Sequence, residues 1–391
     1  AVQDFAYFPV LTRVLFSCYG MMGYFYKLLL PINLSCFYPY PETNDAINTN
    51  WVYAAPLVLA IIGFIIYKYG CNSREIIFGV FFFLLTIALV LQLIPVGDAV
   101  MADRYTYIPF IGLFFIAAHY YNRVLEKRKK QSSIIKTAGI GIILILGSLS
   151  FMRAAKWKDS ITLYNSSLDK YPAAIIYNNR GAALAKEEKH KEALQDFNNV
   201  LKLKPRYPNG HQNRGITLQK LNMFEEAIID FSAEIKMNPK YISAYNNRAN
   251  CYKALNKYPE AITDFTTIIN IDPNNIDAYY SRGESYGRSN MLPQSIADFD
   301  KVISLKPDYA EAYSNRGIAY SLSGNVPKAL EDFNKAIQLK PESYNSYMNR
   351  AVALKSIGRY ADALKDAQYA KKKGQAVDDI FIKELEGLIK K

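Results

Sequence analysis

One short pattern recurs at a fixed interval through the second half of the chain. Asn179-Arg180-Gly181 returns five more times, always with Arg in the middle and Gly or Ala third. The six copies begin at Asn179, Asn213, Asn247, Ser281, Asn315 and Asn349, and each step is 34 residues. A fixed period of this length indicates one supersecondary unit repeated six times, with stacking of neighbours supplying the core.

Within each repeat, the residue types indicate two helices and a join. The Gly or Ala beside Arg allows close approach from the first helix. Phe follows in the second helix of five repeats, four residues after an Ala that Ser295 replaces once, and Pro marks five joins. This arrangement is typical of tetratricopeptide (TPR) repeats. We predict six TPR repeats over residues 174–374, forming an α-solenoid superhelix, and a capping helix over residues 375–391.

Charged and turn residues keep the same period. We expect the six aspartates to pair with the arginines of their own or the following repeat, giving a structural ion-pair ladder. These aspartates are Asp196, Asp230, Asp264, Asp298, Asp332 and Asp366. The turn between the two helices holds Asn or Gly in five repeats, residues that tolerate a left-handed backbone, but Glu188 in the first.

Five apolar segments precede the repeats, at residues 8–30, 51–67, 76–96, 108–121 and 137–152. The third is long enough to cross a bilayer of ~30 Å as a helix, whereas the last two are short and must extend into their flanks. We therefore predict a membrane domain over residues 1–152 with about five transmembrane helices. The predicted fold class is all-α, with multi-pass membrane helices followed by the TPR solenoid.

About half of the net charge of +12 lies in two loops between apolar segments. Those loops hold Lys68, Arg74, Arg123, Lys127, Arg128, Lys129, Lys130 and Lys136. Cytoplasmic loops carry an excess of Lys and Arg, and an odd number of crossings then places the repeats on the extracytoplasmic side, periplasmic or lumenal. We expect membrane lipid as a partner and no nucleic acid, because membrane topology accounts for the excess of Lys and Arg better than nucleic-acid binding does.

Neither cysteine nor histidine spacing indicates a metal centre. The four cysteines lie far apart and the three histidines form no pair at ligand spacing. We predict no metal site and no cofactor in this chain.

The loop after the third apolar segment gathers charges next to hydrocarbon. Asp98, Asp103, Arg104 and Tyr105 lie there, and charges in such a position are costly unless paired or used. Arg104 can bind a phosphate bidentately, and a carboxylate can accept a proton or hold a metal. The alternative is an Asp–Arg contact that fixes the loop, with tyrosines anchored at the interface.

Several membrane-half motifs resemble those of the transmembrane and TPR-repeat protein family. They are Met101-Ala102-Asp103-Arg104-Tyr105-Thr106-Tyr107, Leu30-Pro31-Ile32-Asn33-Leu34-Ser35 and Tyr38-Pro39-Tyr40-Pro41. That family is assigned to GT-C-type protein O-mannosyltransferases, which use a polyprenyl-phosphate sugar as donor on the lumenal side. The resemblance implies that Asp98, Asp103, Arg104 and Tyr105 contact the donor-lipid phosphate.

Such transferases carry their acidic catalytic residues in the first extracytoplasmic loop of a longer membrane domain. Nothing before Phe8 supplies that loop, so we assign no catalytic residue to this chain. We expect the chain to be the C-terminal part of such an enzyme.

Between the two halves, residues 153–173 form a linker with one amphipathic helix. Trp157, Ile161, Tyr164 and Leu168 keep helical spacing. We interpret this helix as the second helix of an incomplete repeat; the alternative is a helix lying at the membrane interface.

The asparagines that precede the arginines recur on one face of the first helices. This asparagine column consists of Asn179, Asn213, Asn247, Asn315 and Asn349, and is broken only by Ser281. An amide offers donors and an acceptor, which suits the backbone of an extended peptide bound on the concave face. The column resembles the asparagine ladder of O-GlcNAc transferase. Alternatively, each asparagine bonds the neighbouring helix and supports stacking.

Two functions follow from these features. The first is part of a membrane protein O-glycosyltransferase whose repeats bind protein acceptors. The second is a non-catalytic, membrane-anchored scaffold for protein–protein interaction. Whether the chain takes part in catalysis stays open at this point, and the sequence identifies neither the sugar nor the acceptor.

Overall fold

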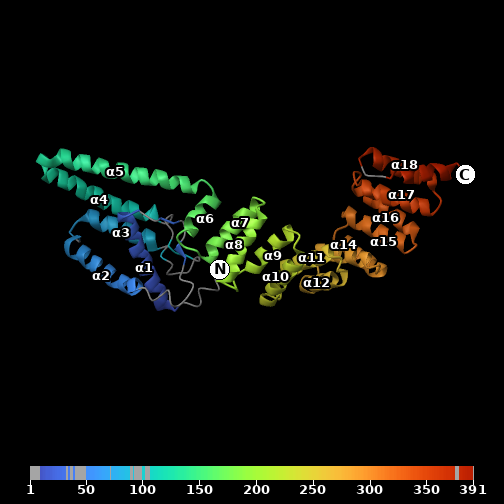
Figure 1. Ribbon diagram of the computed structural model, residues 1–391, viewed down its shortest axis with the longest axis horizontal. Helices are drawn as coiled ribbons and strands as arrows, with labels where there is room; N and C mark the ends of the chain where they lie inside the picture. Colours follow the sequence, from blue (N-terminus) through green and yellow to red (C-terminus); the bar gives the residue numbers. More distant parts are fainter. Residues whose placement is uncertain are drawn as a thin grey trace. The chain divides into compact units, whose positions relative to one another are not determined.

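The computed structural model describes residues 9–31, 34–35, 38–39, 50–70, 72–88, 91, 99–101, 106–374 and 378–390. The chain divides into two compact units, residues 1–213 (unit 1) and residues 214–391 (unit 2). Helices make up most of the described part of both units (Figure 1). The predicted all-α class with a TPR solenoid is confirmed.

Unit 1 begins with five helices that correspond to the five predicted apolar segments. They are α1 (Val10–Leu29), α2 (Asn50–Gly70), α3 (Arg74–Ala88), α4 (Pro109–Lys127) and α5 (Ser132–Ala154). The predicted segment at residues 76–96 is described only to Ala88 and at Leu91. Helix α4 continues past the predicted end because Arg123, Leu125 and Glu126 are good helix formers.

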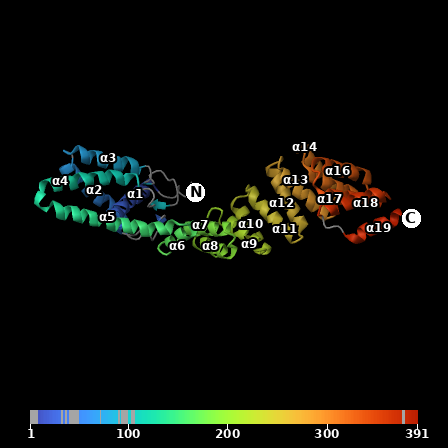
Figure 2. The same cartoon turned by 90° about the horizontal axis from the view of Figure 1, so that it is seen from above.

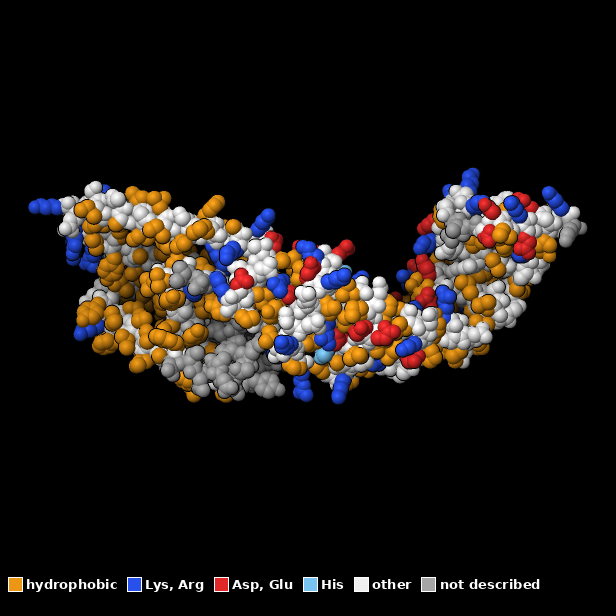
Figure 3. Space-filling view, in the orientation of Figure 1, with side chains coloured by type: hydrophobic (Ala, Val, Ile, Leu, Met, Phe, Trp, Pro, Cys, Tyr) orange, Lys and Arg blue, Asp and Glu red, His pale blue; other side chains and the backbone are white. Residues whose placement is uncertain are grey.

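Two of these helices are long and apolar enough, by length and composition, to cross a membrane. The first covers Trp51–Gly70 and the second Lys129–Trp157, which joins η4 (Lys129–Gln131), α5 and η5 (Ala155–Trp157) into 29 residues. The short fifth segment is therefore extended by both flanks, as expected. Hydrophobic side chains cover much of the visible face of α1–α5 (Figure 3).

Helices α3 and α4 pack side by side through glycines (Figure 2). A Cβ added at Gly79 would lie 2.6 Å from the carbonyl oxygen of Gly112, so only glycine allows the backbones to approach this closely. The ring of Phe78 also lies 5.4 Å from that of Phe115. The start of α3 therefore lies beside the end of α4, and the two basic turns fall at the same end of unit 1.

A short antiparallel strand pair, which the sequence did not predict, joins two loops of unit 1. It consists of β1 (Tyr38–Pro39) and β2 (Ala99–Met101). Its side chains Tyr38 and Met101 enter a buried cluster with Phe83 and Ile87 of α3. The strands therefore hold the loops against α1 and α3.

Leu34, Ser35 and Tyr38 also contact the end of α6 (Ser160–Leu168) and the residues that follow it. Lys170 Nζ donates to the Leu34 carbonyl at 2.8 Å, and the Ser35 hydroxyl donates to Ser167 Oγ at 3.2 Å. The rings of Tyr38 and Tyr171 meet edge to face at 5.3 Å. These contacts fasten the start of the repeat region to the loop after α1 within unit 1.

Helix pairs follow in register with the repeats. Unit 1 continues with α6, α7 (Ala174–Lys186) and α8 (His190–Leu203), and the unit boundary falls inside α9 (Gly210–Lys220). Unit 2 contains α10 (Phe224–Met237), α11 (Ile242–Ala254), α12 (Tyr258–Ile271), α13 (Ile276–Arg288), α14 (Leu292–Leu305), α15 (Ala310–Leu322), α16 (Val326–Leu339), α17 (Tyr344–Ser356), α18 (Tyr360–Lys372) and α19 (Asp379–Ile389).

Small residues permit the packing inside each pair. A Cβ at Gly317 would lie 2.8 Å from the ring of Phe333, whereas Ala249 accommodates its own Cβ while fully buried. Ser295 replaces the usual Ala and donates its hydroxyl to the Gly283 carbonyl at 2.8 Å. The polar atom that breaks the pattern is therefore satisfied.

The turns inside the pairs adopt the predicted left-handed backbone. The φ angles are 60° at Glu188, 60° at Asn222, 58° at Asn256, 58° at Asn290, 81° at Gly324 and 77° at Gly358. Glu188 thus takes the same conformation as the other five, although a side chain without the short polar group of Asn is disfavoured there.

Helix α19 packs against the last pair of helices, as the predicted cap requires. Leu385 is fully buried, and Phe381 and Ile382 pack on the same cluster as Leu354 of α17. Ile380 is 72% exposed and lies on the opposite side of the helix from this contact. The apolar residues of this segment occupy two helix faces, and only packing decides which face is buried.

Candidate peptide-binding face of the repeats

The asparagine column occupies one position of the first helices. Asn179, Asn247, Asn315 and Asn349 are each the sixth residue of their helix, on α7, α11, α15 and α17. All members of the column are half-buried. The boundary between the two units follows Asn213, so Asn179 and Asn213 belong to unit 1 and the other three asparagines to unit 2.

The arginine next to each asparagine is fixed by the aspartate of its own repeat. In each of the six pairs, Arg Nε and Nη2 donate to the two carboxylate oxygens of the aspartate. The Nη2–Oδ1 distances are 2.6 Å for Arg180–Asp196, 2.7 Å for Arg214–Asp230, 2.6 Å for Arg248–Asp264, 2.8 Å for Arg282–Asp298, 2.7 Å for Arg316–Asp332 and 2.8 Å for Arg350–Asp366. The predicted ion-pair ladder is confirmed.

The remaining arginine nitrogen also links successive repeats in unit 2. Arg282 Nη1 donates to Thr266 Oγ1 of the preceding second helix at 3.0 Å, and Arg248 Nη1 donates to Ser232 Oγ at 2.9 Å. The Arg282 guanidinium carbon also lies 5.6 Å and 5.7 Å from the ring centroids of Tyr279 and Tyr286. These contacts hold the backbone that carries the neighbouring asparagine.

Four of the five asparagines fall into two groups, and the fifth, Asn179, accepts a long hydrogen bond, 3.5 Å, from Asn178 Nδ2 of its own helix. Asn213 Nδ2 donates to Asn178 Oδ1, and Asn315 Nδ2 donates to the Tyr280 hydroxyl, both at 2.9 Å. These two amides therefore bond the preceding first helix, as the stacking interpretation predicts. Asn247 and Asn349 make no side-chain hydrogen bond within the part of the chain that the structure describes, so their amides are available to a ligand.

Tyr280 is a site residue that sequence reasoning missed. Its ring stacks on that of Tyr309 at 5.2 Å, and burial raises the pKa of its hydroxyl, which therefore stays protonated. It occupies the position just before the break in the column, where Asn178 and Asn246 stand in other repeats. In this repeat Tyr280-Ser281 replaces the Asn-Asn pair of other repeats, and this double replacement could have identified Tyr280 from the sequence.

Charged residues near the column are of both signs. Lys253 of α11 pairs with Glu284 of α13 at 2.9 Å, and Lys340 pairs with Glu311 at 2.7 Å. The hydrogen bond from Lys340 lowers the pKa of Glu311. On the visible face of unit 2, acidic and basic side chains are interspersed (Figure 3). This face suits a polypeptide of mixed charge better than a uniform polyanion.

The candidates for the donor-lipid phosphate, Asp98, Asp103, Arg104 and Tyr105, all lie outside the described residues. Their role stays a prediction. Among the described residues, no group of three or more His, Cys, Asp or Glu side chains is arranged to hold a metal ion.

Family models described as tetratricopeptide repeat match four segments of the chain. The segments are residues 174–207, 242–275, 276–309 and 310–343. Each match is 34 residues long and begins with the first residue of a first helix. The chain contains tetratricopeptide repeats, a fold that generally binds peptides or proteins.

Three curated relatives named protein O-mannosyl-transferases are similar to parts of the chain. The Caenorhabditis elegans protein F38B6.6 is 26% identical over 204 residues, which are 50% of this chain and 28% of that protein. Human TMTC3 is 31% identical over 115 residues, or 28% and 12% of the two chains. Drosophila melanogaster Tmtc2 is 22% identical over 112 residues, or 29% and 12%. The resemblance seen in the sequence is confirmed, at modest identity and over part of each relative.

Solved structures with TPR repeats are also similar to parts of the chain. YrrB, described as a TPR protein with an unusual peptide-binding site, is 21% identical with a TM-score of 0.43, and covers 47% of this chain and 95% of its own. A TPR protein from Parabacteroides merdae is 20% identical with a TM-score of 0.44, and covers 69% and 99%.

Proposed function

We propose that this chain serves a polyprenyl-phosphate-sugar-dependent protein O-glycosyltransferase, with repeats that hold the protein acceptor and membrane helices that anchor them on the extracytoplasmic side. The similarity to three protein O-mannosyl-transferases carries this proposal. The chain spans little more than a quarter of the first of these relatives and about an eighth of the others, so the activity of a whole enzyme is part of the proposal.

Acceptor binding is supported by the chemistry of the asparagine column. The amides of Asn247 and Asn349 can each donate to a peptide carbonyl and accept from a peptide N–H. An extended acceptor segment offers such groups at regular intervals and keeps its side chains free for modification. Hydrogen bonds to the backbone make binding tolerant of acceptor sequence, which suits an enzyme that modifies many Ser or Thr sites.

Sugar transfer itself requires groups at the donor phosphate. The acceptor hydroxyl forms a bond to the anomeric carbon of the sugar, the bond from that carbon to the phosphate oxygen breaks, and a base takes the hydroxyl proton. In our proposal Arg104 pairs with the phosphate as it leaves and offsets its growing charge. We assign no residue of this chain as that base.

The test uses the full-length protein in native membranes. Transfer from a polyprenyl-phosphate mannose to protein acceptors is compared for wild type, Asp103→Asn and Arg104→Ala, with Lys158→Ala as an exposed charge-removing control elsewhere in the chain. We expect transfer to be lost in the first two variants and kept in the control. Full transfer by both variants would reject the donor role, and no transfer by wild type with any donor would leave an anchored scaffold.

A further inference from the structure

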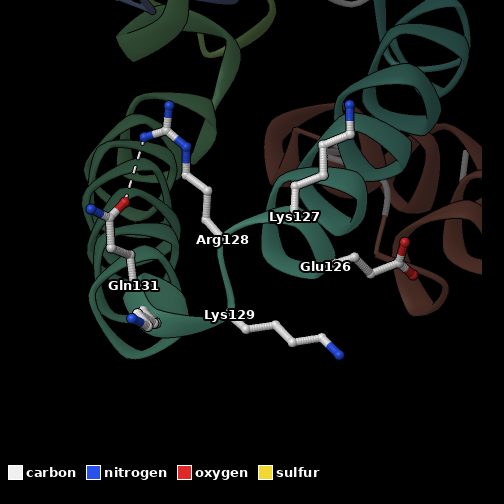
Figure 4. A pocket seen from close by; sticks show the side chains of 6 residues that line it. Glu126, Lys127, Arg128, Lys129 and Gln131 are labelled. Atoms are coloured by element: carbon white, nitrogen blue, oxygen red, sulfur yellow. Dashed lines mark hydrogen bonds between the residues drawn. The ribbon is translucent and has the colours of Figure 1, made fainter.

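A dense cluster of positive charge lies at the turn between α4 and α5. Lys127, Arg128, Lys129 and Lys130 follow one another in the sequence, and with Glu126 and Gln131 they line a shallow surface pocket (Figure 4). The turn is tight because Arg128 ends α4 by donating its N–H to the Val124 carbonyl, and η4 starts at the next residue. Four cationic side chains therefore spread around a single turn.

These cations have no anionic partner in the described part of the chain. All four side chains are exposed, and Arg128 makes only a long hydrogen bond, 3.5 Å, to Gln131 Oε1. Glu126 is the one carboxylate lining the pocket, and it pairs with none of them. Like charges held this close repel one another, so a bound anion would stabilise the turn.

The surroundings of the turn point to a membrane surface. Apolar side chains on both flanking helices are exposed, among them Ile111 and Phe114 on α4 and Ile142 and Ile143 on α5. None of the α5 side chains in its most apolar window is buried. If α5 spans a bilayer, the turn at its start lies at the level of the lipid headgroups.

A second basic turn lies at the same end of unit 1. Lys68 closes α2 and Arg74 opens α3, whose start lies beside the end of α4. Basic side chains are visible at this end of unit 1 (Figure 3). Two basic turns therefore lie at the same end of unit 1.

We propose that the basic turn at Lys127–Lys130 binds the phosphate groups of anionic phospholipids. This inference rests on the membrane anchoring in the proposed function, but not on sugar transfer. Clustered Lys and Arg beside a membrane helix attract an anionic leaflet, and each cation adds to the affinity. The site lies outside the repeats and outside the predicted donor loop, so it adds a lipid requirement to the chain.

The test measures binding of a fluorescent phosphatidylserine to the whole chain in phosphatidylcholine nanodiscs. The variant is Lys129→Gln/Lys130→Gln. The matched control is Lys156→Gln/Lys158→Gln, which removes two exposed lysines at the opposite end of the same long helix. We expect the variant to bind phosphatidylserine at least about tenfold more weakly than wild type, and the control to bind it as wild type does. Raising the salt concentration should weaken binding by wild type more than by the variant.

Three outcomes would overturn the proposal. Equal lipid affinity of variant and wild type, with both inserted, would reject the site alone and leave the proposed function standing. Binding of soluble inositol hexakisphosphate as tightly as of the lipid would reject the assignment to a membrane surface. Failure of the wild-type chain to insert would reject the membrane anchoring and this proposal together.

Discussion

At the scale of single residues, the arginine of each repeat explains how a buried charge is tolerated in the solenoid. Asp298 is almost fully buried, a costly position for a carboxylate without a partner. Arg282 supplies two parallel hydrogen bonds, a third to Thr266 of the preceding repeat, and flat contacts with two tyrosine rings. One side chain therefore joins the two helices of a pair and also joins neighbouring pairs.

Breaking one of these pairs should be far worse than replacing both partners. We expect Arg282→Met to destabilise α13 and α14 by about 3–5 kcal/mol, because it leaves Asp298 buried without a partner. Arg282→Met combined with Asp298→Leu should cost much less. Native-state hydrogen exchange of the α13 and α14 amides in the whole chain measures both effects. Equal losses in the single and double variants would contradict this explanation.

The pairing of charges was predictable from the period, but the partners of the asparagines were not. An Arg and an Asp that recur at the same positions should make the same contact in each repeat. Pairing them avoids the large cost of burying either charge without a partner. The Asn315 amide instead depends on Tyr280 of the preceding repeat, a residue that the period does not share. A contact that depends on a side chain found in one repeat alone can be predicted only from the packed structure.

At the scale of elements, the sequence predicted which helices exist better than where they end. Apolar runs identified α4 and α5, but both helices continue into polar flanks. Lys, Arg and Glu have high helix propensity, so such residues prolong a helix beyond its apolar part. The β1–β2 pair was missed because two and three residues carry too little pattern. The face that α19 buries was also decided by packing, through Leu385 rather than Ile380.

The cap provides a test at this scale with a control in the same helix. Leu385→Ala removes a fully buried side chain and should destabilise the packing of α17, α18 and α19 by about 2–5 kcal/mol. Ile380→Ala removes an exposed side chain and should change stability by no more than about 0.5 kcal/mol. Hydrogen exchange of the α17 and α18 amides distinguishes the two. Similar exchange in both variants would show that α19 does not cap the repeats.

At the scale of the whole molecule, three chemical environments occur in one chain. An apolar set of helices includes two that are long enough to cross a bilayer, a basic turn lies at one end of unit 1, and stacked repeats expose amides that lack partners among the described residues. The contacts of Leu34 and Ser35 with Lys170 and Ser167 join the loop after α1 to the end of α6 and the residues that follow it, within unit 1. The apolar helices and the first repeat helices therefore belong to the same compact unit.

The most direct measurement of the central claim is the affinity of the repeats for an extended acceptor. Binding of an unfolded, Ser- and Thr-containing peptide to the whole chain is compared for wild type, Asn247→Ala/Asn349→Ala, and the control Asn274→Ala in an exposed turn. We predict that the double variant binds about tenfold or more weakly, because two hydrogen-bonding amides are lost, while the control binds as wild type does. Unchanged affinity in the double variant would contradict the assignment of the asparagine column to acceptor binding.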